Sequence, residues 1–333
     1  MSNTRFKHKN ERKNMNRIPQ INPTEATGKT KQLFDGVQAK LGMVPNLSSD
    51  RNYDTAMRSM RVVQISRFGG PEVLNLVEAP VPMPGPGQVL IRIKAIGVNF
   101  ADTLRRMNRY AVTPPLPAIL GSEATGVVEK LGVGVENLAA GPRVAVPLFA
   151  TTNPMGGYAE YAVIDAGLAV RLPDELSFED ATALMIQGLT ALYLTRQAPP
   201  HGKAVLVNAA AGGVGSILIQ LAKRAGAAKV IAGASASSKL SFAQSLGADF
   251  GVNYTESGWI EKLLHATGGA GPDIIYESVG NAVTMESLAA LAPLGQIVIY
   301  GALNIQEFQL GVPELLGLIF KNQSLTGFAS FLY

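Results

Sequence analysis

Residues 203–223 read KAVLVNAAAGGVGSILIQLAK, and this stretch decides the fold. Ala204–Asn208 is a short apolar run, typical of a strand that is buried on both faces. Ala209–Gly215 is a turn of small residues. From Ser216 onward, apolar side chains recur at the spacing of a helix that packs on a sheet. The stretch therefore predicts a strand, a glycine turn and a helix in that order.

These three elements together form a site for an anion. Backbone N–H groups are unpaired at such a turn, and the helix dipole is positive there. Gly212, Gly213 and Gly215, with Val214 among them, would let a pyrophosphate approach the backbone closely. An ordinary tight turn is the alternative, but the strand and the helix on either side favour dinucleotide binding.

Strand and helix patterns alternate from Gly202 onward. The predicted strands are Ala204–Asn208, Lys229–Gly233, Phe250–Asn253, Asp273–Glu277, Gln296–Tyr300 and Ser324–Gly327. The predicted helices are Ser216–Arg224, Ser237–Leu246, Ile260–Thr267, Val283–Leu291 and Val312–Phe320. This alternation predicts an α/β fold with a doubly wound parallel sheet of the Rossmann type.

The chain between Met60 and Ser177 has a different sequence pattern, which predicts short strands joined by turns rich in proline and glycine. The predicted strands are Val62–Ile65, Leu74–Glu78, Val89–Ala95, Ala124–Glu129, Arg143–Pro147, Ala159–Val163 and Ala169–Leu172. A helical connection begins at Ser177. We therefore expect a β-rich lobe ahead of the parallel sheet.

Composition narrows the class of protein. The 333 residues are 47% hydrophobic, which is enough for two cores. With no cysteine the chain cannot form disulfides, and we expect a cytoplasmic protein. The net charge of +4 is uneven: residues 1–59 carry 11 Lys/Arg against 5 Asp/Glu, and the remainder carries 18 against 20. A nearly neutral body gives no support to nucleic acid as its main partner.

No membrane partner is expected either. Ala204–Ala222 carries no charged residue, but Asn208, Gln220 and three glycines interrupt it, so it does not predict a membrane span.

The amino-terminal segment differs from the rest of the chain. Met1–Arg17 is polar and basic, so we expect disorder there, followed by one amphipathic helix that ends near Gly42. Arg17–Asn46 resembles the opening of the carboxymuconolactone decarboxylase-like proteins. The resemblance stops before the cysteines of that family, so it implies no such activity.

Residues 60–333 resemble the zinc-free quinone oxidoreductase branch of the medium-chain dehydrogenase/reductases. The resemblance rests on an ordered series of motifs: RFGGPEVL (67–74), GVNFAD (97–102), LGSEATGVVEKLGVGV (120–135), GGYAEY (156–161), QGLTA (187–191), NAAAGGVGS (208–216), SLGAD (245–249), VNY (252–254) and ESVG (277–280). It implies a Rossmann-like lobe and a GroES-like lobe. It also implies an NADPH-dependent reductase that passes hydride directly to a quinone or an α,β-unsaturated carbonyl compound.

The sequence favours NADP(H) over NAD(H). An NAD site usually has an acidic residue about 20 positions after the glycines, and the stretch GASASSK (233–239) contains none. It offers Ser235, Ser237, Ser238 and Lys239, which suit a 2′-phosphate. The resemblance places Lys239 and Tyr254 on that phosphate. A solvated lysine and a strand-end tyrosine are the alternative.

The resemblance also implies the remaining site residues. Thr190, Val279, Tyr300 and Gly301 match positions that contact the nicotinamide end of the cofactor, although Val279 could equally be a core residue. Asn99 and Tyr110 match pocket residues that could hydrogen-bond the acceptor carbonyl. Leu104 replaces a frequent tyrosine, so the pocket is more apolar. Asp102 could be a helix cap.

No metal site is expected. The zinc-dependent relatives ligate zinc through a cysteine and a histidine at the positions of Asn99 and Ser122. The only histidines, His8, His201 and His265, have no ligand spacing between them.

The resemblance divides the chain into residues 1–59, an appended basic segment; 60–187, the catalytic lobe; 188–327, the NADP-binding lobe; and 328–333, the start of a return to the catalytic lobe. In the family this return supplies further elements, so we expect a truncated catalytic lobe with low activity. The resemblance allows a homodimer. The alternatives are an NADPH-binding protein without catalysis, which could bind nucleic acid through the basic tail, and a truncated fusion product with little or no catalysis.

Overall fold

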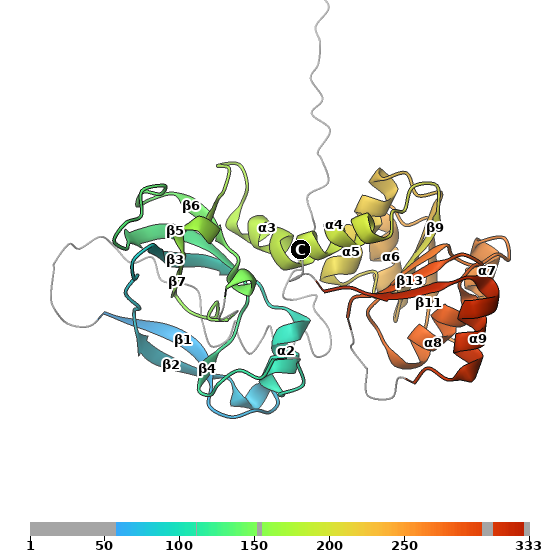
Figure 1. Cartoon of the computed structure of the whole chain (residues 1–333), viewed down its shortest axis with the longest axis horizontal. Coiled ribbons are helices and arrows are strands. Elements are labelled where there is room, and N and C mark those ends of the chain that lie inside the picture. The colour runs from blue at the N-terminus through green and yellow to red at the C-terminus, as the bar shows by residue number, and fades with distance from the viewer. Residues whose placement is uncertain (1–57, 111, 152–154, 302–308, 330–333) are drawn as a thin grey trace, which may run out of the picture.

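The computed structural model describes residues 58–110, 112–151, 155–301 and 309–329. The predicted disordered tail, the predicted amphipathic helix and the segment 17–46 lie outside these residues. The described chain forms two lobes that lie side by side, joined by a run of helix (Figure 1).

The second lobe is a six-stranded parallel sheet. Its strands are β9 (Ala204–Val207), β10 (Lys229–Ala234), β11 (Phe250–Asn253), β12 (Ile274–Glu277), β13 (Gln296–Ile299) and β14 (Ser324–Gly327). They are arranged in the order β11-β10-β9-β12-β13-β14, and all the pairs are parallel. This is the strand order of the doubly wound dinucleotide-binding fold, and the order reverses between β9 and β12. The predicted Rossmann sheet is confirmed.

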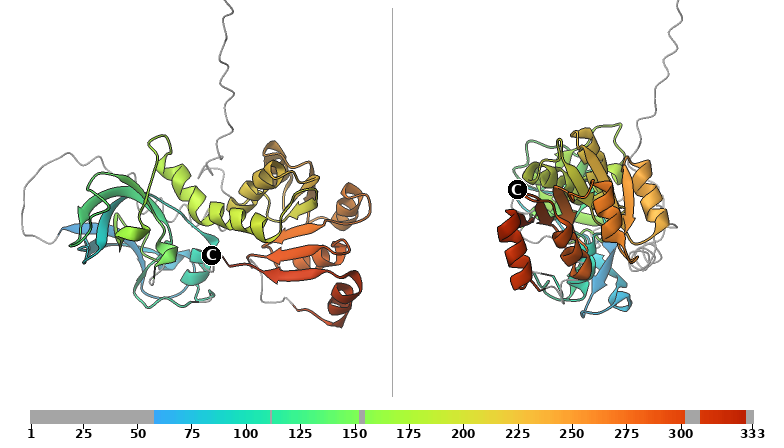
Figure 2. Two further views of the ribbon diagram at one scale, coloured as in Figure 1. Left: turned by 45° about the horizontal axis from the view of Figure 1, so that its top comes forward. Right: turned by 90° about the vertical axis from the view of Figure 1, so that its right-hand side faces the viewer.

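Helices cover both faces of this sheet (Figure 2). They are α5 (Gly213–Arg224), α6 (Ser237–Ser245), α7 (Trp259–Ala266), α8 (Asn281–Ala290) and α9 (Val312–Lys321). Alternate side chains of β9 enter two different cores: Val205 and Val207 pack with Ile219 of α5, and Leu206 packs with Leu263 of α7. Burial on both faces explains why the strand sequences are continuously apolar.

The first lobe consists of two antiparallel sheets. The larger has the order β7-β3-β5-β6-β8 and the smaller has the order β2-β1-β4. The strands are β1 (Ser59–Ile65), β2 (Asn75–Pro80), β3 (Gln88–Ile96), β4 (Ala118–Ile119), β5 (Ala124–Leu131), β6 (Arg143–Val146), β7 (Tyr161–Asp165) and β8 (Val170–Arg171). Short 3-10 turns cover Pro71–Val73, Leu148–Ala150 and Ala166–Leu168. The predicted β-rich lobe is confirmed.

The connection between the lobes is helical throughout. α3 (Phe178–Ala183) passes into a π-helical turn (Leu184–Gly188) and then into α4 (Leu189–Gln197). Ser177 caps α3, because its hydroxyl accepts a hydrogen bond from the Asp180 N–H at 3.0 Å. π-helical turns are rare and recur at functional sites.

Several local predictions differ from the structure, and two of these differences concern helices that carry predicted site residues. α5 begins at Gly213 and not at Ser216, because Gly212 is the extended N-cap (φ −79°, ψ 173°) and the next glycines already have helical geometry. α2 (Phe100–Arg106) was not predicted, and seven residues are too few for a clear hydrophobic period.

Helix α5 packs so closely on the preceding turn that Gly215 must be a glycine. A Cβ atom at this position would lie 2.4 Å from the carbonyl oxygen of Ala209 and 2.9 Å from Cα of Ala210. Both atoms belong to the backbone and cannot move aside alone.

The substitution Gly215→Ala should therefore lower the free energy of unfolding of this lobe by about 1–3 kcal/mol through overpacking. Gly317→Ala, at an open position in α9, is the matched control and should raise it by about 0.5–1 kcal/mol. The single tryptophan, Trp259, is buried in this lobe, so its fluorescence during urea denaturation measures both changes. Equal effects of the two substitutions would contradict this packing.

Candidate functional site

The glycine turn joins β9 to α5 at the carboxyl end of the sheet. Ala209 has a positive φ of 51°, and the Gly212 N–H donates to its carbonyl oxygen at 2.8 Å. A Cβ on Gly212 would lie 3.1 Å from the Ala209 carbonyl oxygen, and a Cβ on Gly213 would lie 2.8 Å from Cγ of Gln187. The first N–H groups of a helix lack partners inside the helix, so this turn offers donors of the kind that bind a pyrophosphate.

The side chains predicted to bind a 2′-phosphate meet beyond the ends of β10 and β11. The Lys239 ammonium donates to the Ser235 hydroxyl at 3.1 Å. The Tyr254 hydroxyl also hydrogen-bonds Ser235, and burial raises the pKa of this tyrosine. Ser237 and Ser238 begin α6 beside them. A cationic group and hydroxyl groups therefore converge where an NAD site would carry a carboxylate.

A second group of predicted residues lies at the ends of β12 and β13. The Tyr300 side chain hydrogen-bonds Ser278, and a Cβ on Gly301 would lie 2.9 Å from Cβ of Ser278. The neighbouring Val279 is held by the buried Glu277 carboxylate, which accepts the Val279 N–H. These residues thus lie at the carboxyl ends of neighbouring strands, close to the point where the strand order reverses.

Glu277 itself was quoted only as part of a motif. Its carboxylate also accepts the Gly280 N–H at 3.1 Å and a hydrogen bond from the Asn208 amide, which in turn donates to Ser287 at 3.0 Å. All three side chains are fully buried. They hold the turn after β12 at a fixed distance from the turn after β9.

Asn99 caps α2 in the β-rich lobe. Its N–H donates to the Asp102 carboxylate at 3.0 Å in a capping box. Asp102 is therefore the third residue of the helix and not its cap. It also accepts from the Tyr158 hydroxyl at 3.0 Å and from Arg105 at 3.2 Å, and burial raises its pKa.

Tyr110 is connected to Asn99 through Arg105 and Asp102. The Arg105 guanidinium lies 4.6 Å from the centre of the Tyr110 ring, and Arg105 is anchored on Asp102. The two predicted pocket residues are therefore linked through a cation–π contact and an ion pair.

The sequence analysis missed Glu123, which is fully buried just before β5. One carboxylate oxygen accepts from the Asn99 side-chain amide at 2.8 Å, and the other accepts from the Ile186 N–H of the π-helical turn at 2.8 Å. Burial raises the pKa of Glu123 to about 7. The Gly97 backbone lies directly against this carboxylate and leaves no room for a Cβ.

The sequence analysis also missed Gln187, which joins the two lobes. Its side-chain N–H donates to the side-chain amide oxygen of Asn99, Oδ1, at 2.8 Å. The same side chain lies against Gly213. Both missed residues stand inside quoted motifs, and a charged residue within an apolar run was the available signal for Glu123. Thr190 is buried one turn later, at the start of α4.

The residues at the zinc-ligand positions do not suit zinc. Both ends of the Asn99 amide are hydrogen-bonded, and the Ser122 hydroxyl accepts from the Arg105 guanidinium, whose positive charge would repel a cation. Within residues 58–110, 112–151, 155–301 and 309–329, no three His, Asp or Glu side chains are grouped as metal ligands. In the same ranges no helix is both long and apolar enough to cross a membrane.

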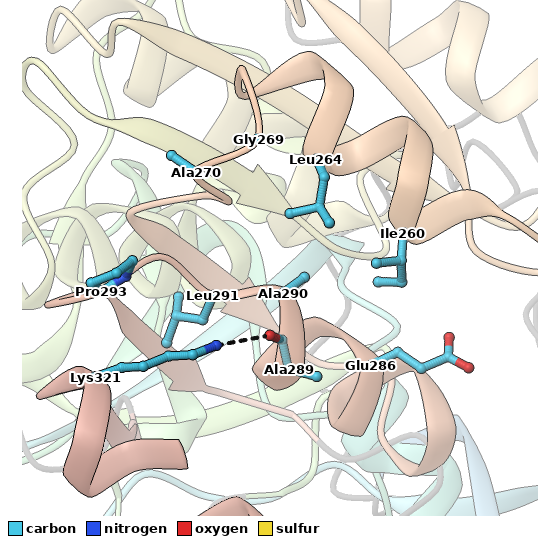
Figure 3. A pocket seen from close by; sticks show the side chains of 10 residues that line it. All are labelled: Ile260, Leu264, Gly269, Ala270, Glu286, Ala289, Ala290, Leu291, Pro293 and Lys321. Atoms are coloured by element: carbon cyan, nitrogen blue, oxygen red, sulfur yellow. Dashed lines mark hydrogen bonds between the residues drawn. The ribbon is translucent and has the colours of Figure 1, made fainter.

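A surface pocket lies elsewhere, on the outer face of α7 and α8 (Figure 3). It is lined mainly by apolar side chains, including Ile260, Leu264 and Leu291, and Lys321 reaches across it to the Ala289 carbonyl oxygen. Its lining contains none of the predicted site residues. It is therefore separate from the predicted cofactor site.

Comparison with known proteins identifies the family. Residues 213–332 match the family described as zinc-binding dehydrogenase, and residues 85–174 match the alcohol dehydrogenase GroES-like domain. Quinone oxidoreductase of Pseudomonas aeruginosa is 39% identical over 241 residues, 72% of this chain and 72% of that protein. The 2-haloacrylate reductase of Burkholderia sp is 37% identical over 246 residues, 71% of this chain and 72% of that protein.

A solved structure agrees with these relatives. Escherichia coli quinone oxidoreductase, complexed with NADPH, matches with a TM-score of 0.73 and 34% identity over 82% of each chain. The chain therefore belongs to the medium-chain dehydrogenase/reductase superfamily. Within that superfamily it is an oxidoreductase of the quinone reductase type.

The raised pKa of Glu123 makes stability depend on pH. The ordinary pKa of glutamate is 4.5, so between 4.5 and about 7 the folded protein binds more protons at this group than the unfolded chain does. The free energy of unfolding should therefore fall as pH rises through this window, by at most about 3 kcal/mol from this group.

Glu123→Gln should remove this part of the pH dependence, and the exposed Glu261→Gln is the matched control. Urea denaturation at pH 5, 6, 7 and 8 measures the difference between each variant and the unmodified protein. A difference between Glu123→Gln and the unmodified protein that stays constant from pH 5 to pH 8 would contradict the assignment.

Proposed function

We propose that the chain reduces quinones and α,β-unsaturated carbonyl compounds with NADPH and without zinc. The observation that carries this proposal is the position of Gln187, which contacts both Asn99 and Gly213. Through this side chain, the amide that would bind an acceptor carbonyl and the turn that would bind a pyrophosphate become parts of one site. NADPH, when bound, supplies the hydride.

The residues of the chain would hold the two reactants in place. The glycine turn binds the pyrophosphate, and Lys239, Ser235 and Tyr254 bind the 2′-phosphate. Thr190, Val279, Tyr300 and Gly301 surround the nicotinamide. Such positioning is the main contribution of a protein to hydride transfer.

Asn99 would bind the acceptor. Its side-chain nitrogen has two N–H groups, of which one is donated to Glu123. The second can donate to the acceptor carbonyl oxygen and stabilise the negative charge that develops there during hydride transfer. Tyr110, held under Arg105, offers a second donor. The names of the relatives, quinone oxidoreductase and 2-haloacrylate reductase, support a conjugated carbonyl acceptor.

A steady-state assay tests the proposed activity. NADPH oxidation should be measured with a benzoquinone, a cyclic enone and a 2-haloacrylate, with and without a chelator. We expect turnover with at least one conjugated carbonyl, no effect of the chelator and no stoichiometric zinc by elemental analysis. NADPH binding without turnover of any acceptor would favour the alternative of a binding protein, and loss of activity on chelation would overturn the zinc-free assignment.

The cofactor preference rests on Lys239. NADPH should bind more tightly than NADH, and Lys239→Ala should weaken NADPH binding about tenfold to a hundredfold while leaving NADH binding nearly unchanged, because only NADPH carries the 2′-phosphate. Isothermal titration of both cofactors measures this. The exposed Lys262→Ala on α7 is the control. Equal affinity of the unmodified protein for both cofactors would contradict the assignment.

A further inference from the structure

The side-chain carbonyl oxygen of Gln187 has no hydrogen-bond donor. The N–H group of this side chain donates to the Asn99 carbonyl oxygen at 2.8 Å, but its own carbonyl oxygen, Oε1, is buried and accepts no hydrogen bond. A buried acceptor without a donor is costly, and folded proteins pair nearly all such atoms. Oε1 lies in the π-helical turn, on the side chain that touches Gly213. A donor from a ligand bound against this turn would satisfy it.

The direction of this hydrogen-bond chain is fixed at Glu123. Both carboxylate oxygens accept N–H groups, one from Asn99 and one from the Ile186 backbone. Above about pH 7 this carboxylate is ionised and has no proton to donate, so the Asn99 amide must turn its nitrogen toward Glu123. Its oxygen then faces Gln187, which must in turn offer its own nitrogen. The Gln187 oxygen is left as the free end of the chain.

The chemistry of the two reactants decides which one can use this oxygen. The carbonyl groups of a quinone or an enone only accept hydrogen bonds, so they cannot pair with another acceptor. The nicotinamide carboxamide and its ribose both carry donors.

We propose that Gln187 Oε1 accepts a hydrogen bond from an N–H or O–H group on the nicotinamide–ribose half of the dinucleotide, and that Glu123 is the positioning residue that keeps this oxygen turned toward it. The inference rests on the proposed function, because it assigns one more contact within the same site. The two neighbouring amides would then bind different reactants. Asn99 donates to the acceptor, and Gln187 accepts from the cofactor.

Gln187→Met keeps the length of the side chain and removes its hydrogen bonds. Dissociation constants should be measured at pH 8 by isothermal titration with NADPH, ADP-ribose 2′-phosphate and 2′,5′-ADP. We expect about tenfold weaker binding of NADPH and unchanged binding of 2′,5′-ADP, which lacks the nicotinamide and its ribose. ADP-ribose 2′-phosphate identifies the donor: weaker binding indicates the ribose, and unchanged binding indicates the carboxamide. Gln244→Met, at an exposed position in α6, is the control.

Glu123→Gln tests the positioning role. The new amide must still accept the Ile186 N–H, so it turns its nitrogen toward Asn99 and reverses both amides that follow. Gln187 would then present an N–H where the ligand donor lies. We expect NADPH binding to weaken about tenfold, and the double variant with Gln187→Met to be no weaker than Gln187→Met alone, because both changes remove the same contact.

The outcomes separate this inference from the proposed function. If the unmodified protein binds NADPH but Gln187→Met changes its affinity less than twofold, or weakens 2′,5′-ADP equally, the Gln187 contact is wrong and the proposed function stands. If the two single penalties add in the double variant, the positioning role of Glu123 is wrong. If the unmodified protein binds no NADPH, the inference and the proposed function both fail.

Discussion

The arrangement of the site depends on the two hydrogen bonds that the Glu123 carboxylate accepts. This carboxylate is buried, and a buried carboxylate is tolerated only when hydrogen bonds replace its lost hydration. The two donors that it receives come from different parts of the chain, the Asn99 side chain and the backbone of the π-helical turn. These two hydrogen bonds therefore fix the position of the π-helical turn relative to the β-rich lobe.

The helical connection between the lobes also contacts the lobe with the parallel sheet, through Gln187 of the π-helical turn. Gln187 lies between Asn99 and Gly213, so the amide on α2 and the first turn of α5 are separated by one side chain. The remaining site residues occupy the carboxyl ends of β10 to β13, where the buried cluster of Glu277, Asn208 and Ser287 fixes the loops. The site is thus built from residues of both lobes, and hydrogen bonds fix the positions of these residues relative to one another.

Most of the secondary structure could be predicted from the sequence. β11 and β14 have the predicted bounds, and the other strands of the parallel sheet differ by one residue at an end. The start of α5 was misplaced because glycine lowers helix propensity, although here three glycines lie within or next to the first turn. Helix α2 was missed because its stability comes from the capping box and from the buried contacts of Asp102, not from an apolar face.

The doubly wound sheet and the glycine turn could be predicted from the sequence alone, because both depend on local patterns. Ser235 and Lys239 were found by the absence of an acidic residue near the second strand, and the family resemblance added Tyr254. The hydrogen bonds that join Glu123, Asn99 and Gln187 could not be predicted in this way. Their contacts span 24, 63 and 88 residues of chain, and nothing in a local pattern states which distant donor a buried acceptor will meet. That pairing follows from the packing of the two lobes, since burial forces each polar group to find whichever partner the fold brings within reach.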